Sequence, residues 1–323
     1  MAPSLQKTVL ITGCNPGGIG HSLAKSFHSH GLRVFATARD PSVLTSLNDI
    51  GITTLPLEVT NASSITTLYE TISSLTAGAG LDYLVNNAGK NYTVPALDIN
   101  VDEAREMFDV NLFGVMRICS TFAPLLIAAR GTIVQIGSVA GTMPYVFGSA
   151  YNASKAALHS YTDTLRVELR PFGVDVVTIV TGGVRSRIAR TVRELDEDSL
   201  YTPVREEYMR RQQHSQEVGM PNEKYAESVV RQVLKGRGRR EIWEGGGSWL
   251  VWFVRLLLPR WVMVGFIMFR SEENNRLLTA DRIPCSPACS SSGNSMALGQ
   301  RRRGTERVHL GLQSIILRRD DTK

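Results

Sequence analysis

The chain has 323 residues, of which 43% are hydrophobic and 20% charged, a balance that supports a large buried core. Its net charge is +6, but residues 300–323 alone carry seven basic and three acidic side chains. Most of the positive charge therefore belongs to the C-terminal end, and it gives little reason to expect nucleic-acid binding by the folded part.

The four cysteines are too few and too scattered for a disulfide framework. Two of them, Cys285 and Cys289, have no following Cys or His pair that would complete a zinc site, so we expect no metal. The N-terminus lacks a signal-peptide pattern, because its apolar run Thr8–Thr12 is short and leads directly into a glycine-rich loop. These features predict a reducing, cytosol-facing environment.

Short runs rich in β-branched residues alternate with stretches of helical length between Lys7 and about Val180. The predicted strands are Thr8–Thr12, Arg33–Thr37, Thr53–Leu57, Asp82–Asn86, Thr132–Ile136 and Asp175–Val180. The longest predicted helices are Val101–Ala129 and Ser149–Arg170. Strands separated by helices imply right-handed crossovers, so the sequence predicts an α/β fold with a Rossmann-type, doubly wound parallel sheet flanked by helices.

Residues 184–222 are polar and highly charged and carry no strand pattern. In a doubly wound fold such a segment lies over the carboxyl ends of the strands, as a solvated helical hairpin, a substrate lid, or both. Asn222 then stands at the N-cap of a further predicted helix, Glu223–Leu234.

The glycine-rich loop Thr12–Gly20 follows the first predicted strand and opens the first predicted helix. Glycines there let the backbone bend tightly and approach a diphosphate, while the helix N-terminus offers free N–H groups. This context favours dinucleotide binding over an ordinary strand-to-helix turn. The predicted contacts are Gly13, Asn15, Gly18, Ile19 and Gly20.

The end of the second predicted strand indicates which dinucleotide is bound. Thr37 and Ala38 are uncharged, and Arg39 and Asp40 follow them. A carboxylate at the strand tip would bind the ribose hydroxyls of NAD, whereas an arginine suits the 2′-phosphate of NADP. The sequence predicts NADP(H) with Arg39 as the phosphate contact, a prediction that weakens if Asp40 turns inward.

Tyr151 and Lys155 are spaced i and i+4, so on a helix both side chains project from one face. A free phenol has a pKa of about 10 and exchanges protons poorly at neutral pH. A nearby ammonium lowers that pKa and makes the phenol an effective general acid. Ser138 follows a predicted strand, where its hydroxyl can hold a substrate carbonyl.

A series of motifs over residues 7–245 resembles the short-chain dehydrogenase/reductase family: the glycine loop, Asn86-Asn87-Ala88-Gly89, Asn111, Ser138, and Tyr151 with Lys155. The resemblance implies that Tyr151 donates a proton to a carbonyl oxygen as hydride arrives from the nicotinamide. Lys155 would lower the pKa of Tyr151 and hold the nicotinamide ribose. Ser138 would orient the carbonyl, and Asn111 would anchor a water that relays protons from Lys155.

The same resemblance implies further cofactor contacts. Besides Tyr151 and Lys155, these are Asn87, Ala88, Gly89, Glu58 near the adenine, and Gly183 and Val184 beside the nicotinamide. Three departures stand out: the glycine loop is one residue longer than usual, Glu58 replaces the usual Asp, and Thr181 replaces a common Pro. The longer glycine loop, the turn Thr181-Gly182-Gly183-Val184 and the segment after Gly245 together resemble a fungal group typified by NADPH-dependent 1-acyldihydroxyacetone-phosphate reductases.

Trp243–Arg270 contains all four tryptophans and long apolar runs that Arg255, Pro259 and Arg260 interrupt. Tryptophan and arginine favour the headgroup level of a membrane. The segment is therefore interpreted as a monotopic membrane anchor, or else as an apolar helix that closes the substrate pocket or a dimer interface. The first interpretation predicts the cytosolic face of the endoplasmic reticulum or a lipid-droplet surface, and the second a cytoplasmic enzyme.

We thus expect an NADP-binding catalytic domain over 1–245, a hydrophobic membrane-associating segment over 246–272 and a largely disordered, low-complexity basic tail over 273–323. The resemblance also implies a homodimer or homotetramer through the two longest helices.

The leading functional hypothesis is NADPH-dependent reduction of a ketone on a hydrophobic substrate, with 1-acyl-dihydroxyacetone phosphate as first choice. Arg185, Arg187 and Arg190 either receive the substrate phosphate or form a solvated basic face. The alternative is a ketoreductase or alcohol dehydrogenase of a fungal secondary-metabolite pathway, polyketide or terpenoid. A non-catalytic NADP-binding scaffold is disfavoured, because a scaffold needs no proton relay.

Overall fold

The computed structural model describes residues 6–189, 192–217, 219–236, 238–259, 261–262 and 264–265, without the side chains of Ala189 and of residues 213–216. The predicted tail 273–323, with Cys285 and Cys289, lies outside the described residues, as does Arg190.

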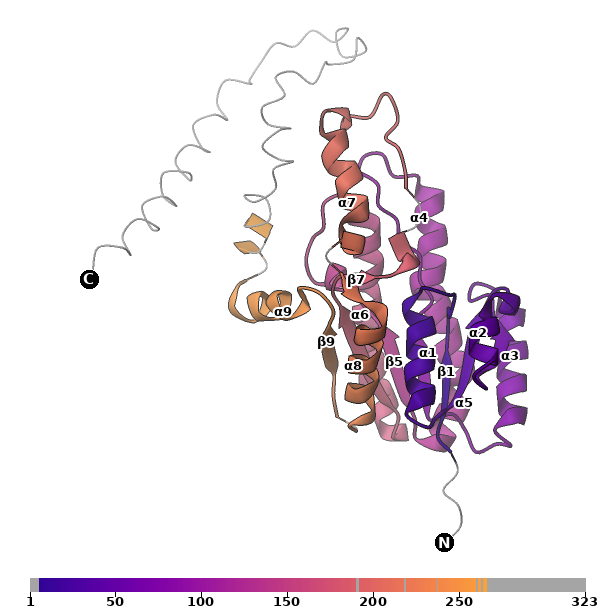
Figure 1. Cartoon of the computed structure of the whole chain (residues 1–323). Helices are drawn as coiled ribbons and strands as arrows, with labels where there is room; N and C mark the ends of the chain where they lie inside the picture. Colours follow the sequence, from indigo (N-terminus) through magenta and orange to yellow (C-terminus); the bar gives the residue numbers. More distant parts are fainter. Residues whose placement is uncertain are drawn as a thin grey trace, which may run out of the picture. The chain divides into compact units, whose positions relative to one another are not determined.

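A seven-stranded parallel sheet forms the centre of the fold, in the order β3-β2-β1-β4-β5-β6-β9 (Figure 1). The strands are β1 Thr8–Ile11, β2 Arg33–Ala38, β3 Thr53–Pro56, β4 Tyr83–Asn86, β5 Thr132–Ile136, β6 Asp175–Thr181 and β9 Glu241–Glu244. The central strands consist of residues with buried side chains, which is why their sequences are almost uninterruptedly apolar. The predicted α/β Rossmann-type fold is confirmed.

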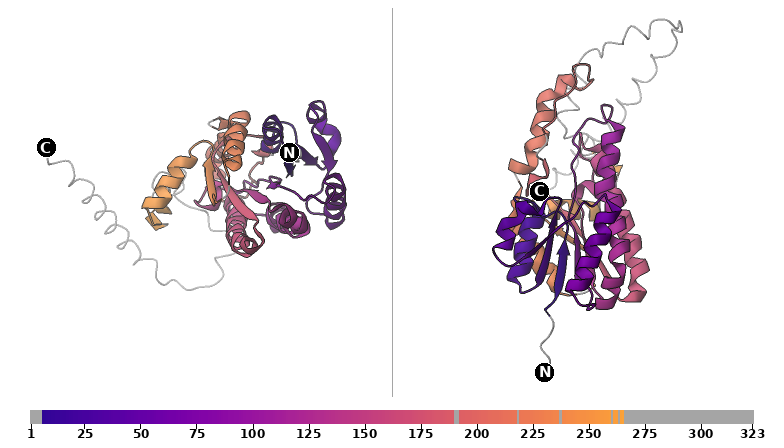
Figure 2. Two further views of the ribbon diagram at one scale, coloured as in Figure 1. Left: turned by 90° about the horizontal axis from the view of Figure 1, so that it is seen from below. Right: turned by 90° about the vertical axis from the view of Figure 1, so that its right-hand side faces the viewer.

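Helices cover both faces of this sheet (Figure 2). One core cluster packs α1 Ile19–Ser29, α2 Thr45–Asn48 and α8 Asn222–Leu234 against the sheet. The other packs α3 Ala62–Leu75, α5 Gly114–Ala129 and α6 Ser149–Leu169. The remaining elements are α4 Val101–Phe108, α7 Arg205–Glu217, α9 Ser248–Leu257 and the two-residue strands β7 Val184–Arg185 and β8 Met220–Pro221.

The expected helical stretch Val101–Ala129 is continuous, with α4 and α5 joined by a π-helical turn at Asp109–Phe113. One prediction for an individual element was wrong, and one strand was missed. Asn222 is the first residue of α8, not its cap, and its amide donates to the Gly17 carbonyl at 3.0 Å. Strand β9 was not predicted, because only Ile242 in its sequence Glu-Ile-Trp-Glu is buried.

By length and composition, one helical stretch among the described residues, Val101–Ala129, is apolar enough to cross a membrane. Its inward side belongs to the core, where Leu112, Val115 and Phe122 pack beneath the sheet. Its apolar character is therefore accounted for by packing within this fold.

Candidate active site

Several of the residues predicted to bind cofactor and substrate lie in the segments that follow four central strands. The glycine loop follows β1, Asn87 follows β4, Ser138 follows β5 and Gly183 follows β6. Because parallel strands end at the same edge of the sheet, these distant segments meet at the position where doubly wound folds bind ligands.

Two glycines of the loop are required by its geometry. Gly13 has φ +72°, and a Cβ there would lie 2.8 Å from the Cα of Ala88. A Cβ on Gly20 would overlap the amide of Asn87 and lie 2.6 Å from the Gly13 carbonyl. Only residues without side chains allow the loop, α1 and the segment after β4 to approach so closely.

Asn87 and Thr12 hold this close approach together. The Asn87 amide donates to the carbonyls of Thr12 and Gly13 at 2.8 and 2.9 Å. The Thr12 hydroxyl accepts the backbone N–H groups of Asn87 and Ala88 at 3.0 and 2.9 Å. Thr12 was not among the predicted site residues, although its place directly before Gly13 could have indicated this role.

The N-terminus of α1 fits a diphosphate. Gly18 occupies the N-cap with no side-chain cap, Ile19 begins the helix, and the first turn contains no acidic residue. The Asn15 carbonyl accepts the Gly18 N–H at 3.0 Å and shapes the turn, while the Asn15 side chain is exposed. The uncapped N–H groups and the positive end of the helix dipole make this an anion-binding position.

The adenosine end of the predicted site includes Arg39 and Glu58. The Arg39 side chain is 80% exposed, and its Nε lies 4.0 Å from one carboxylate oxygen of Glu58. The other carboxylate oxygen of Glu58 accepts hydrogen bonds from the backbone N–H and the hydroxyl of Thr60. Asp40 caps the short 3-10 helix Pro41–Leu44 by accepting the Ser42 N–H at 2.9 Å. The carboxylate of Asp40 is therefore engaged locally, and Arg39 is the charged group at the strand tip.

The turn after β6 is fixed through its backbone. Gly183 exchanges hydrogen bonds with Gly246 and accepts the Met220 N–H at 2.9 Å. Val184 is buried in the core, so only the backbone of this turn is placed to border a nicotinamide. The neighbouring Thr181 hydroxyl pairs with that of Tyr225 at 2.7 Å, a contact that the sequence did not reveal.

The structure brings together three of the predicted catalytic side chains. Tyr151 and Lys155 lie on successive turns of α6, with the ammonium 5.9 Å from the centre of the phenol ring. Ser138 forms a hydrogen bond with Tyr151 that lowers the pKa of the phenol. Burial outweighs this bond and raises the pKa of Tyr151 to about 12.

The expected depression of the Tyr151 pKa by Lys155 is therefore not seen. Lys155 is buried, and its ammonium donates to the Ile136 carbonyl at 2.9 Å. Burial also lowers the pKa of Lys155 to about 8. Tyr151 is protonated at neutral pH, as an unperturbed phenol also is, and its proton transfer depends on a cation that stabilises the phenolate as it forms.

Asn111 lies in the π-helical turn, below this group. Its amide donates to the Lys90 carbonyl at 2.9 Å and to the Ser154 hydroxyl at 3.1 Å, and its side-chain oxygen accepts the Lys90 N–H at 2.8 Å. Gly89 is in contact with it, since a Cβ there would lie 3.4 Å from that oxygen. The Asn111 side chain is thus occupied in holding the segment after β4 to α6.

His159, one turn beyond Lys155, was missed by the sequence analysis. Its Nε2 accepts the backbone N–H of Ser138 at 3.2 Å. Gly137 and Gly141 pack against the same ring: a Cβ on Gly137 would overlap Nε2, and one on Gly141 would lie 2.7 Å from Cε1. The spacing of eight residues from Tyr151 was the available signal, because it places His159 on the same helix face.

Residues 192–217, including α7, lie over this edge of the sheet (Figures 1 and 2). Tyr208, Leu195 and Val204 bury a cluster with Phe147, and the Tyr208 hydroxyl donates to the Thr93 carbonyl at 3.0 Å. An ion pair of 2.8 Å joins Arg193 to Glu103 of α4. The segment is therefore packed onto the loops beside Tyr151, as expected of a lid.

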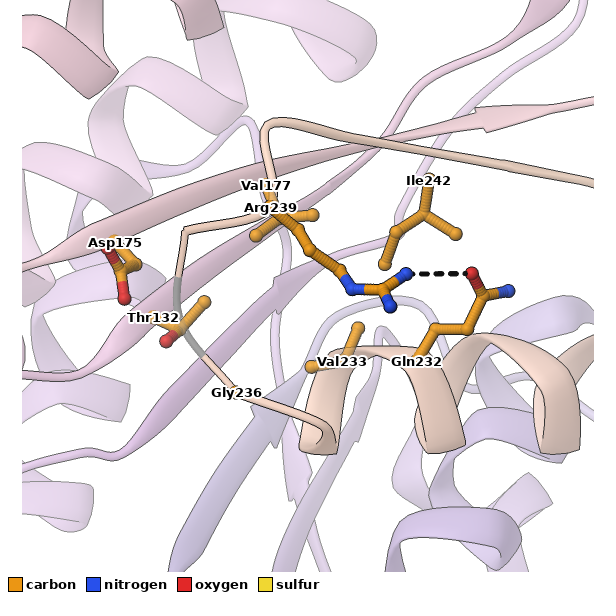
Figure 3. A pocket seen from close by; sticks show the side chains of 8 residues that line it. All are labelled: Thr132, Asp175, Val177, Gln232, Val233, Gly236, Arg239 and Ile242. Atoms are coloured by element: carbon orange, nitrogen blue, oxygen red, sulfur yellow. Dashed lines mark hydrogen bonds between the residues drawn. The ribbon is translucent and has the colours of Figure 1, made fainter.

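A small pocket lies elsewhere, near the beginnings of β5 and β6, where Arg239 donates to Gln232 at 3.2 Å (Figure 3). It has room for about one water molecule. Its size and its distance in the fold from the carboxyl ends of the strands exclude it as the substrate site.

Fold and site together define a dinucleotide-dependent oxidoreductase. A family model for short chain dehydrogenase matches residues 7–197, and the chain belongs to the short-chain dehydrogenase/reductase family. Short-chain dehydrogenase ptmH of Penicillium ochrochloron is 44% identical over 260 residues, covering 80% of this chain and 95% of that protein.

Two further relatives carry cofactor names. The NADPH-dependent 1-acyldihydroxyacetone phosphate reductase of Schizosaccharomyces pombe is 41% identical over 240 residues, covering 72% of this chain and 80% of that protein. A solved closed form of serine dehydrogenase complexed with NADP+ is 26% identical with a TM-score of 0.61, covering 73% of this chain and 92% of that chain.

Proposed function

We propose that the chain is an NADPH-dependent ketoreductase that reduces a carbonyl of a hydrophobic secondary metabolite, polyketide or terpenoid, with Tyr151 as the proton donor. The observation that carries this proposal is the grouping of Tyr151, Lys155 and Ser138 at the carboxyl edge of the sheet, with the Lys155 ammonium 5.9 Å from the centre of the phenol ring and Ser138 hydrogen-bonded to that phenol. A protonated donor beside a second hydroxyl is the arrangement that carbonyl reduction needs.

In this mechanism the nicotinamide, when bound, supplies the hydride that attacks the carbonyl carbon. The Ser138 hydroxyl donates to the carbonyl oxygen and holds it beside Tyr151. As charge develops on that oxygen, Tyr151 transfers its proton to it, which gives the alcohol and leaves a phenolate. The buried ammonium of Lys155 stabilises that phenolate and would hold the nicotinamide ribose. Because the Asn111 side chain is fully engaged, any relay water would bind its main-chain carbonyl.

The residues present fit NADP(H). Gly13, Gly20 and the uncapped start of α1 would hold the diphosphate, and Arg39 would pair with the 2′-phosphate. Asp40 is engaged as a helix cap and so does not present a carboxylate to that phosphate. The relatives named for NADPH and NADP+ support the same choice.

The substrate end favours an apolar ketone. Aromatic side chains gather beside Tyr151: Tyr151 packs against the cluster that contains Tyr92, Tyr145 perturbs its pKa, and Phe147 joins the lid. Of the arginines weighed as contacts for a substrate phosphate, Arg185 donates to the Glu217 carbonyl at 3.4 Å, and Arg187 lies against Gly17 of the glycine loop, on the cofactor side of the site.

A second candidate substrate is 1-acyl-dihydroxyacetone phosphate, favoured by the similarity to the Schizosaccharomyces pombe reductase. However, short-chain dehydrogenase ptmH is similar at a higher identity and over more of both chains. These similarities do not favour the lipid substrate, and we therefore rank a ketone of secondary metabolism first.

The test is NADPH oxidation by the full-length protein with a panel of apolar polyketide and terpenoid ketones, beside 1-acyl-dihydroxyacetone phosphate. Tyr151→Phe provides the control, because it removes the proton donor and leaves the glycine loop intact. We expect turnover of an apolar ketone that is lost in Tyr151→Phe while NADPH still binds. Preferential turnover of the acyl phosphate would shift the assignment to the second candidate, and turnover unchanged in the variant would remove Tyr151 from the mechanism.

A further inference from the structure

Helix α9 exposes an unusually apolar surface. Six of its ten residues are large hydrophobic side chains that are 47% to 68% exposed: Trp249, Leu250, Trp252, Phe253, Leu256 and Leu257. Contiguous apolar patches of this kind mark interaction sites, whereas scattered apolar residues do not.

The helix is fixed to the sheet by its other side. Ser248 is buried and donates to the Gly245 carbonyl at 2.9 Å. Arg255, the only charged residue of α9, pairs with Glu241 at 3.4 Å and lies 5.8 Å from the centre of the Trp243 ring. Its charge is thus directed back to β9, and the outward surface of the helix is left apolar.

We propose that α9 is an in-plane helix that docks the enzyme on an anionic lipid surface. The stretch from Trp249 to Phe269 contains no acidic residue. Its two arginines are Arg255, which is paired with Glu241, and Arg260, and Trp261 within the stretch is 76% exposed. Tryptophan and arginine are the residues that favour lipid headgroups, and positive charge without negative charge complements anionic lipids. A helix of ten residues is about 15 Å long, half the hydrocarbon thickness, so α9 lies in the interface and does not span it.

Docking at this position has a consequence for the substrate. Gly246, two residues before α9, is hydrogen-bonded to Gly183 of the turn that borders the nicotinamide. The lipid-facing helix is therefore tied directly to the catalytic edge of the sheet (Figure 1). An apolar ketone dissolved in the lipid would be concentrated close to the site.

The test uses the full-length protein and its own fluorescence. All four tryptophans lie between Trp243 and Trp261, so their emission reports this region alone. Vesicles of phosphatidylcholine with phosphatidylglycerol should shift the emission to the blue and carry the protein upward in flotation. Pure phosphatidylcholine should do so less.

The variant Trp252→Glu/Phe253→Glu/Leu256→Glu should lower vesicle binding by roughly a hundredfold or more. The matched control Val167→Glu/Phe172→Glu alters side chains that are 72% and 53% exposed on another surface, and it should bind like the wild type. Absence of flotation by the wild type, or equal flotation by both variants, would overturn the proposal. So would a wild-type dimer in gel filtration that the α9 variant dissociates, because a second copy would then be the occupant. NADPH oxidation with a water-soluble ketone should be the same in all three proteins. Vesicle binding is measured without turnover, so a failure of the docking proposal can be told apart from a failure of the proposed function.

Discussion

Replacing His159 by Leu tests whether this residue positions Ser138. Burial and the neighbouring Lys155 lower the pKa of His159 to about 4, so the imidazole is neutral at physiological pH. Its Nε2 is then an acceptor for the Ser138 N–H, and the ring proton resides on Nδ1. Leucine has a similar volume but accepts no hydrogen bond.

The size of the effect follows from the orphaned donor. A buried N–H without a partner costs about 1–3 kcal/mol, and the turn carrying Ser138 can avoid this cost only by moving. Because about 1.4 kcal/mol corresponds to a factor of ten, we expect kcat/KM for the best ketone to fall by roughly 5- to 150-fold. The Kd for NADPH should change little, since the glycine loop does not contact His159.

The control is His159→Gln, whose side-chain oxygen reaches a position close to that of Nε2. It should recover most of the activity, whereas a purely space-filling role would make the leucine variant the better one. Steady-state kinetics of both variants, with NADPH titrations by fluorescence, decide the matter. If His159→Leu retains full kcat/KM, the hydrogen bond to Ser138 does not position the catalytic hydroxyl.

Three other outcomes are expected. Gly13→Ala should destabilise the fold by about 1–3 kcal/mol and weaken NADPH binding, because it combines a positive φ with overlap on Ala88. Gly31→Ala, at φ +82° in open space, is the control for the φ alone. Equal losses of stability in urea unfolding of the two variants would exclude a contribution from the overlap. Arg39→Ala should raise the Kd for NADPH about tenfold and leave that for NADH unchanged, and parallel changes in both titrations would argue against a 2′-phosphate contact. Folding lowers the pKa of His159 from 6.5 to about 4, so the unfolded state binds more protons than the folded state between these two pH values. The free energy of unfolding should therefore fall by about 3 kcal/mol as the pH drops from 6.5 to 4. The variant His159→Gln should lose less stability over the same pH range.

The sheet could be predicted from the sequence because its central strands are buried on both faces. Val9, Leu10 and Ile11 are wholly buried in β1, and such runs are readable without knowledge of the partners. Strand β9 could not be read this way, because it lies at the sheet edge and its one buried residue, Ile242, stands among two glutamates and a tryptophan. The π-helical turn at Asn111 leaves no pattern either, since its residues also fit an ordinary helix.

The electrostatics of the catalytic group were beyond the reach of residue spacing. The i and i+4 relation placed Tyr151 and Lys155 on one face, as the structure has it. The direction of the ammonium, however, is set by the Ile136 carbonyl on a neighbouring strand, and the pKa of the phenol is set by burial. Both depend on tertiary packing, so the sequence identified the groups without their charge states.

The cofactor half and the substrate half of the site differ in how directly the sequence specifies them. This difference explains why the cofactor was easier to predict than the substrate. The cofactor half is built from backbone: glycines at close approach, an uncapped helix start and the main chain of Gly183, each specified by a few adjacent residues. The proposed substrate half depends on side chains of distant segments, since Phe147 and Tyr208 pack in one cluster and Tyr92 in another beside Tyr151, and these clusters form only in the folded chain. Substitutions in that lid can change the substrate while leaving hydride and proton transfer untouched. Exchanging residues 192–212 for those of a relative with a known ketone should therefore move specificity without moving the cofactor preference, and a change in both would show that the halves are coupled.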